Sequence, residues 1–148
     1  MCFKPMINDI TTTPDAPPVF RRLAGPSANA GRDMAYPPGN SAVQRKAYPD
    51  LAPLALPLPP EEGFRRAAAA VKASTGWEVV SEDAPAGRIE AVATTRLLRY
   101  KDDVVIEIRT SAEGCAVHMR SKSRLGRGDF GANAKRIRSF LGALAASR

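Results

Sequence analysis

The sequence lacks most of the residues that build metal centres, disulfide frameworks and common catalytic sets. Its 148 residues include two cysteines, Cys2 and Cys115, and one histidine, His118. Two cysteines so far apart give neither a disulfide framework nor metal-ligand spacing. One histidine without a second histidine or paired cysteines makes no metal set. We therefore predict no metal ion, no cofactor and no catalytic residue, and nothing requires an oxidising compartment.

Long apolar segments are also missing. No run approaches the ~20 residues that are needed to cross a bilayer, and residues 1–20 lack the basic-then-apolar order of a secretory signal. These absences predict a soluble chain without a signal peptide or a transmembrane helix. Nothing in the sequence indicates a compartment or an oligomeric state.

Proline is nearly absent from the second part of the chain. Twelve of the 13 prolines lie in the first 60 residues, and Pro85 is the exception. Because proline fixes φ and lacks an N–H donor, this first part can hold little regular helix or central strand. We predict a proline-rich extended arm over residues 1–53 and a folded domain over residues 54–148. Apolar residues in the arm, such as Ile10 and Phe20, indicate that it packs in part on the domain.

The domain has the pattern of an α+β fold in the order α-β-β-β-β-α. A helix begins after Pro59 with two acids in its first turn and ends near Gly76. Alternating apolar residues predict four strands, at 77–81, 88–97, 103–110 and 115–123. In the second strand this alternation places Ile89 and Leu97 on the core face. A basic amphipathic helix begins at Asp129. Short connections favour an antiparallel four-stranded sheet with both helices on its apolar face.

The other face of the predicted sheet carries charges of both signs. They come from Glu90, Glu107, Arg109, Arg120 and Lys122. An antiparallel sheet can leave such a face in water, or the proline-rich arm can cover it. We favour partial cover, because the apolar residues of the arm need a surface to pack on. The predicted outer face has no aromatic side chain for base stacking, so specific nucleic-acid binding is not expected.

The positive charge is confined to the end of the chain. Residues 115–148 contain eight bases and one acid, a net charge equal to the +7 of the whole chain. Such a local patch suits an anionic partner. A solvated face with internal ion pairs is an equally good interpretation.

Four segments resemble one known family, the bacterial and plant proteins that share the domain of unknown function 1499. They are Y-P-D-L-A-P-L at residue 48, R-I-E-A at residue 88, K-D-D-V-V-I at residue 101 and R-S-K-S-R-L-G-R-G-D-F-G-A-N-A-K-R-I at residue 120. I-N-D-I-T-T at residue 7 is similar to the segment before this domain in some bacterial relatives. Membrane-spanning helices often precede it there, so the resemblance implies an association with a membrane or cell envelope. It implies no reaction.

Most residues of the terminal run have structural roles in this interpretation. Asp129 can cap the last helix, glycines permit the turn before it, and Asn133 can bond back to that turn. An antiparallel neighbour would bring bases of the run opposite the acids at 102–103. The predicted structural set is Asp102, Asp103, Gly126, Asp129, Gly131, Asn133 and Arg136.

The same run also contains a candidate anion site, formed by Arg120, Lys122, Arg124 and Arg127. Exposed glycine N–H groups and a helix N-terminus would add to it, but the Asp129 carboxylate opposes an anion, so we favour the structural role. The function predicted from the sequence is a non-catalytic binding or scaffolding module that uses this basic strand-helix surface, near a membrane or envelope. Alternatives are an enzyme with a carboxylate and arginine site on the polar sheet face, and a weak, non-specific nucleic-acid binder.

Overall fold

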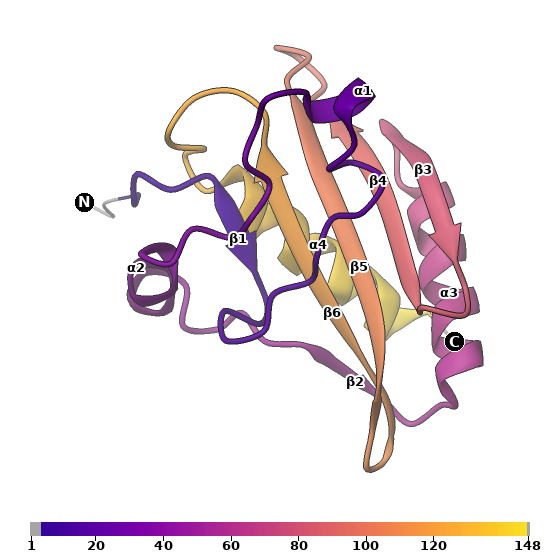
Figure 1. The fold of residues 1–148 in the computed structure, drawn as a ribbon. Helices are drawn as coiled ribbons and strands as arrows, with labels where there is room; N and C mark the ends of the chain where they lie inside the picture. The colour runs from indigo at the N-terminus through magenta and orange to yellow at the C-terminus, as the bar shows by residue number, and fades with distance from the viewer. Residues whose placement is uncertain (1–3, 148) are drawn as a thin grey trace.

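One antiparallel sheet with a cover on each face forms the fold (Figure 1). A computed structural model describes residues 4–147. Two helices, α3 (Pro60–Ala73) and α4 (Ala132–Ala146), lie behind the sheet, and the N-terminal arm crosses in front of it. Both faces of the sheet are therefore protected from water over much of their area.

The sheet has six strands in the order β3-β4-β5-β6-β1, and β2 also pairs with β6. Every pairing is antiparallel. The strands are β1 (Asp9–Thr11), β2 (Leu54–Leu56), β3 (Trp77–Asp83), β4 (Arg88–Thr94), β5 (Lys101–Ser111) and β6 (Gly114–Ser123). The α+β class and the antiparallel meander of four consecutive strands, β3 to β6, are confirmed.

The predicted count of four strands and two helices is wrong. The residues before α3 add β1 and β2, together with the short helices α1 (Pro26–Asn29) and α2 (Asn40–Ala47). Both added strands have three residues and pair with β6 at the edge of the sheet. Three residues are too few to show a period, and the edge is where a proline-rich chain can add a strand.

The main core lies between the sheet and the helices α3 and α4, as the alternation predicted. It includes Ile89 from β4, Val104 and Ile106 from β5, and Met119 from β6, each at most 1% exposed. Leu97 is an exception, because it was assigned to the core face and is 88% exposed. β4 ends at Thr94, and the alternation in the sequence continues past the end of the strand into a loop.

The arm covers the polar face of the sheet. After β1 the chain runs across β6 and β5 toward β4, turns at α1 and returns to α2 (Figure 1). Phe20, Leu23 and Met34 of the arm form a second apolar cluster with Val92 and Val105 of the sheet. Phe20 of the arm is buried in this cluster, and Ile10 is buried in the main core. The arm therefore covers the polar face, which decides between the two alternatives for it.

Candidate functional site

Arg120 lies at the centre of the covered face. Its guanidinium forms a two-pronged ion pair with Asp9 of β1, with Nε–Oδ1 at 2.9 Å and Nη2–Oδ2 at 2.8 Å. The side chains are 2% and 1% exposed. A bidentate pair of this kind fixes both position and orientation. The pair therefore holds β1 against β6 from beneath the arm.

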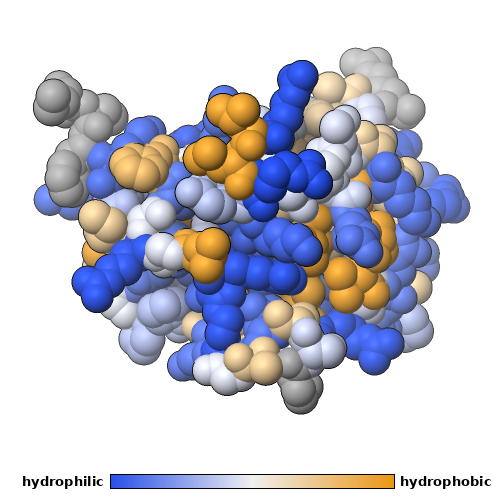
Figure 2. Space-filling model, turned by 90° about the horizontal axis from the view of Figure 1, so that it is seen from above, coloured by the Kyte–Doolittle hydropathy of each residue, from blue (hydrophilic) through white to orange (hydrophobic). Residues whose placement is uncertain are grey.

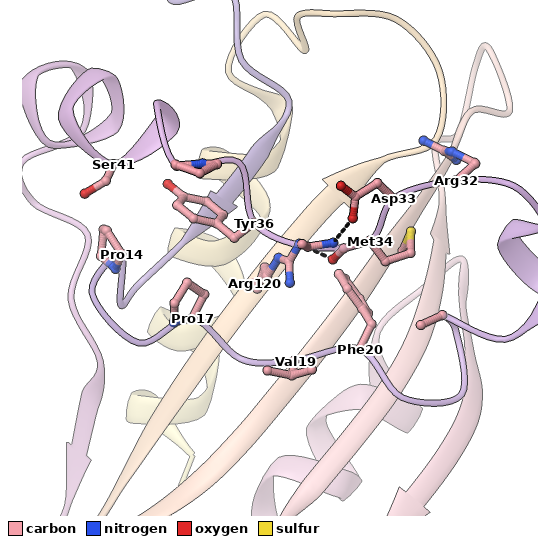
Figure 3. Close-up of a pocket in the computed structure, with 13 residues that line it drawn as sticks. Pro14, Pro17, Val19, Phe20, Arg32, Asp33, Met34, Tyr36, Ser41 and Arg120 are labelled. Atoms are coloured by element: carbon pink, nitrogen blue, oxygen red, sulfur yellow. Dashed lines mark hydrogen bonds between the residues drawn. The ribbon is translucent and has the colours of Figure 1, made fainter.

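The same guanidinium also binds the arm. Nη1 donates to the carbonyl of Pro18 at 3.1 Å and Nη2 to the carbonyl of Met34 at 2.8 Å. The ring of Phe20 lies 4.7 Å from the guanidinium carbon and the ring of Tyr36 lies 5.7 Å from it. Figure 3 shows Arg120 between the outgoing and returning halves of the arm. One of the four bases of the candidate anion site thus fastens the arm to the sheet.

Glu90 holds the arm at a second point. Its carboxylate accepts three consecutive backbone N–H groups, from Arg21 at 2.9 Å, Arg22 at 2.8 Å and Leu23 at 3.1 Å. Glu90 is 1% exposed. Successive N–H groups directed at one anion form a concave nest, and here the anion belongs to the protein itself.

Glu107 makes a third link between sheet and arm. It accepts the N–H of Val19 at 3.0 Å and forms ion pairs with Arg88 and Arg109. Burial raises the pKa of Glu107, but the Val19 N–H and the two arginines lower it more, so the net shift is downward. Glu107 is thus held ionised within a lattice of ion pairs.

The four bases of the candidate anion site do not converge on one open site. Arg120 is buried with Asp9, and Lys122 lies 3.8 Å from the same carboxylate. Arg124 binds the buried Asp103 at 2.7 Å, a strand-to-strand contact that the sequence predicted. Arg127 is exposed, in the connection between β6 and α4. The prediction that these bases face outward is wrong for Arg120, because the arm covers it.

A cavity of about 650 Å³ opens beside Arg120, between the two halves of the arm (Figure 3). Pro17, Phe20 and Tyr36 line it, while Glu90 and Glu107 do not. Burial and the Asp9 charge raise the pKa of the Tyr36 hydroxyl to about 12. Tyr36 donates its proton to Gln44 at 3.1 Å. The cavity wall is mostly apolar, and its polar groups already have partners.

His118 lies beside the arm, with Nδ1 2.6 Å from the hydroxyl of Thr13. Burial, then the Arg109 charge, lower its pKa to about 4, with a smaller opposing effect of Glu107. We predict an imidazole titration midpoint near 4 by NMR, against about 6.5 for a free histidine. The folded state holds the neutral ring, so His118 makes stability fall as the pH drops from about 6.5 toward 4. A midpoint near 6.5 would show that the arm does not enclose the ring.

The alternation of bases and serines in β6 has a structural explanation. The side chains of the bases point to the arm, and those of Ser121 and Ser123 point to α4. Asn133 of α4 forms hydrogen bonds with both serines. Its Oδ1 accepts Ser121 at 2.6 Å and its Nδ2 donates to Ser123 at 2.8 Å. Arg136 of α4 binds Asp102 at 2.7 Å. Burial raises the pKa of Asp102 although Arg136 opposes this shift. The predicted structural set therefore joins β5, β6 and α4.

Asp129 caps α4 from just before its first turn, because the helix begins at Ala132 rather than at Asp129 as predicted. It accepts the backbone N–H of Gly131 at 2.8 Å and that of Asn133 at 3.1 Å. We predict that Asp129→Ala lowers stability by about 1 kcal/mol, or roughly 2–4 °C in Tm. Asp129→Asn keeps an acceptor and should lose less. An unchanged Tm for Asp129→Ala in a thermal melt would contradict the capping role.

A second polar region, at the end of the sheet, was predicted only in part, through Arg124 and Arg127 of the candidate anion site. We call it the loop end, and it consists of residues 95–101 and 124–131. Arg96, Arg99, Lys101 and Arg127 are exposed here, and none forms an ion pair with a residue that the structure describes. Figure 2, which looks onto the molecule from above, shows hydrophobic groups among the blue of this face. The R-L-L-R sequence at residue 96 could have indicated an exposed basic and apolar loop, but its first two residues were assigned to the predicted strand at 88–97.

Neither metal ligands nor a membrane span are found within residues 4–147. No three histidine, cysteine or carboxylate side chains in this range form a group that could hold a metal ion. None of its helices is long and apolar enough to cross a bilayer.

The fold and its buried polar links define a class of α+β protein in which an N-terminal arm is fastened across the sheet by charged side chains. The chain belongs to the family described as Protein of unknown function (DUF1499), whose model matches residues 9–144. The match begins at the first residue of β1, so it includes the arm as well as the sheet and helices. A search of curated proteins gave no match.

Proposed function

We propose that this protein is a non-catalytic binding module that recognises an anionic partner through the exposed bases of the loop end. The observation that carries the proposal is the division of the basic residues into two sets. Arg120, Lys122 and Arg124 are next to carboxylates of the protein itself. Arg96, Arg99, Lys101 and Arg127 are exposed and have no such partner among the described residues. Of these two sets, only the second has charge available for a ligand. Arg21, Arg22, Lys46 and Lys135 are likewise exposed without an ion pair among the described residues, but they are outside the loop end.

The local charge of the loop end supports an anionic partner. The connection from Thr95 to Lys101 contains three bases and no acid. The two acids that follow are buried, Asp102 with Arg136 and Asp103 with Arg124. Each exposed base near an anionic surface contributes about 1 kcal/mol of attraction, and salt screens it. Binding is therefore expected to be moderate in strength and to weaken as salt rises.

The position of the arm argues against the two alternative functions. An enzyme site on the polar face would need Glu90, Glu107 and Arg120 open to a substrate. Instead, Glu90 accepts three N–H groups of the arm and Arg120 donates to two of its carbonyls. A nucleic-acid strand would need stacking rings on an open sheet face, and the arm lies across that face (Figure 1).

Binding to heparin, a sulfated polyanion, tests the proposal. The triple variant Arg96→Gln/Arg99→Gln/Arg127→Gln should bind about 100-fold more weakly than wild type in low salt, since three bases are removed. Fluorescence anisotropy with labelled heparin over a series of salt concentrations measures this difference.

A matched control removes the same charge elsewhere. Lys46, Arg65 and Lys72 are exposed and lie on α2 and α3, away from the loop end. Arg65 and Lys72 form ion pairs with Glu62 and Glu82, so this control matches the loss of net charge. The triple glutamine variant at these positions should bind heparin within threefold of wild type. Equal weakening of both variants, or no heparin binding by wild type, would refute the proposed function.

A further inference from the structure

Large exposed hydrophobic side chains gather at the loop end. Of nine such residues among those described, six lie in or beside it: Met6, Leu97, Leu98, Tyr100, Leu125 and Phe130. The two connections share the wall of one cavity, to which Tyr100, Leu125 and Phe130 all contribute. Arg124 also donates its N–H to the carbonyl of Lys101 at 3.2 Å. Met6 lies against Gly128 of the second connection, so the two connections and Met6 form a single region.

Phe130 is held outward at a conformational cost. Its φ is +53°, in the left-handed region that bulky residues rarely adopt, and its side chain is 91% exposed. Arg99, at the tip of the other connection, has a φ of +57°. Strained residues of this kind gather at functional sites, where the surrounding structure maintains them. Asp129 supplies that support on one side by binding the N–H of Gly131.

Bases alternate with these hydrophobic residues along the chain. Leu97 and Leu98 stand between Arg96 and Arg99, and Leu125 follows Arg124. Figure 1 shows the connection between β4 and β5 projecting beyond the end of the sheet. Projecting apolar side chains within a basic ring fit a surface that is anionic outside and apolar beneath. The interface of an anionic bilayer has both properties.

We propose that the loop end docks on an anionic lipid bilayer. Leu97, Leu98 and Phe130 enter the boundary between headgroups and acyl chains, while Arg96, Arg99 and Arg127 contact lipid phosphates. The inference rests on the proposed function and adds the nature of the anionic partner. Apolar insertion and electrostatic attraction together give reversible peripheral binding, which needs no membrane-spanning helix.

Vesicle sedimentation separates this inference from the proposed function. Wild type should bind vesicles of phosphatidylcholine with 30% phosphatidylserine and should not bind phosphatidylcholine alone. Leu97→Ser/Leu98→Ser should weaken binding to the anionic vesicles at least tenfold, with heparin binding unchanged within twofold. The control Val43→Ser/Val80→Ser alters exposed residues of α2 and β3. It should bind the anionic vesicles and heparin as tightly as wild type does.

Fluorescence quenching measures insertion directly and does not depend on the serine variant. Phe130→Trp should be quenched by brominated acyl chains in the anionic vesicles, while wild type, with Trp77 on the helix side of the sheet, should not be. Absence of quenching, or unchanged vesicle binding by the double serine variant, overturns the inference and leaves heparin binding intact. Self-association of wild type that the serine variant abolishes would assign the patch to a second copy of the chain, which also overturns it.

Discussion

Arg120→Met is expected to lower the free energy of unfolding by about 3–5 kcal/mol, because it removes the two-pronged partner of the buried Asp9 carboxylate and leaves Lys122, 3.8 Å away, as its remaining cation. Asp9 is 0% exposed, and its two oxygens receive Nε and Nη2 of Arg120. The substitution also removes the donors to the carbonyls of Pro18 and Met34. Such a loss is a large part of the 5–15 kcal/mol that stabilises a typical domain.

Urea denaturation followed by circular dichroism measures the effect. Arg138→Met is the matched control, because Arg138 also forms a two-pronged pair, with Asp50, on the exposed surface. An exposed pair contributes about 1 kcal/mol or less, so the control should change little. In the double variant Asp9→Asn/Arg120→Met, the loss should be smaller than the sum of the single losses, since both substitutions break one contact. If Arg120→Met lowered the free energy of unfolding by less than about 1 kcal/mol, the role of Arg120 in holding the arm on the sheet would be contradicted.

Glu90→Ala is expected to cost about 2–4 kcal/mol, the second largest effect. The substitution removes the acceptor of three N–H groups, and a buried donor without a partner costs about 1–3 kcal/mol. Leu23, one of the three donors, is 1% exposed, so water cannot readily take the place of the carboxylate. Water can reach Arg21 and Arg22 more easily, because both are exposed. Their share of the loss is therefore smaller.

Urea denaturation and amide hydrogen exchange together test this prediction. In Glu90→Ala the amides of residues 21–23 should exchange much faster than in wild type. The exchange rates of the β5 amides should rise only as far as the loss of global stability requires. Glu90→Gln keeps one acceptor oxygen and should lose about half as much. Glu78→Ala, at an exposed position of β3, should stay within about 0.5 kcal/mol of wild type. Unchanged protection of residues 21–23 in Glu90→Ala would rule out the nest.

The long elements could be predicted from the sequence because each shows its period several times. β4 to β6 have seven to eleven residues, and α3 and α4 have fourteen and fifteen. The Asp129 cap and the bond from Asn133 Nδ2 back to Asp129 Oδ2, at 2.8 Å, were also predictable, since both are local to the start of α4. The contacts of Asn133 with Ser121 and Ser123 in β6 are not local and were not predicted. By contrast, β1 and β2 have three residues each, and only tertiary pairing with β6 makes them strands.

The sequence predicted cover of the polar face by the arm only as one of two alternatives, the other being a face left in water. The Asp9–Arg120 pair joins residues 111 apart in the sequence, and no local pattern links them. From the sequence alone, Arg120 and Arg127 are therefore equivalent candidate ligands of an anion. The part of the loop end at residues 95–101 was missed for a different reason, because Leu97 continues the alternation of β4 beyond its last residue. Thr95 and Tyr100 close that loop, with the Thr95 N–H donating to the Tyr100 carbonyl at 2.8 Å.

Amide hydrogen exchange with and without anionic vesicles tests the central claim, which is that the arm is a fixed part of the fold and the partner binds at the loop end. We predict that residues 21–23 exchange slowly in both conditions, since Glu90 holds their amides. New protection should arise in residues 95–101 and 124–131 only when vesicles are present. Vesicle-induced changes in the arm, with no change in these two connections, would contradict the account.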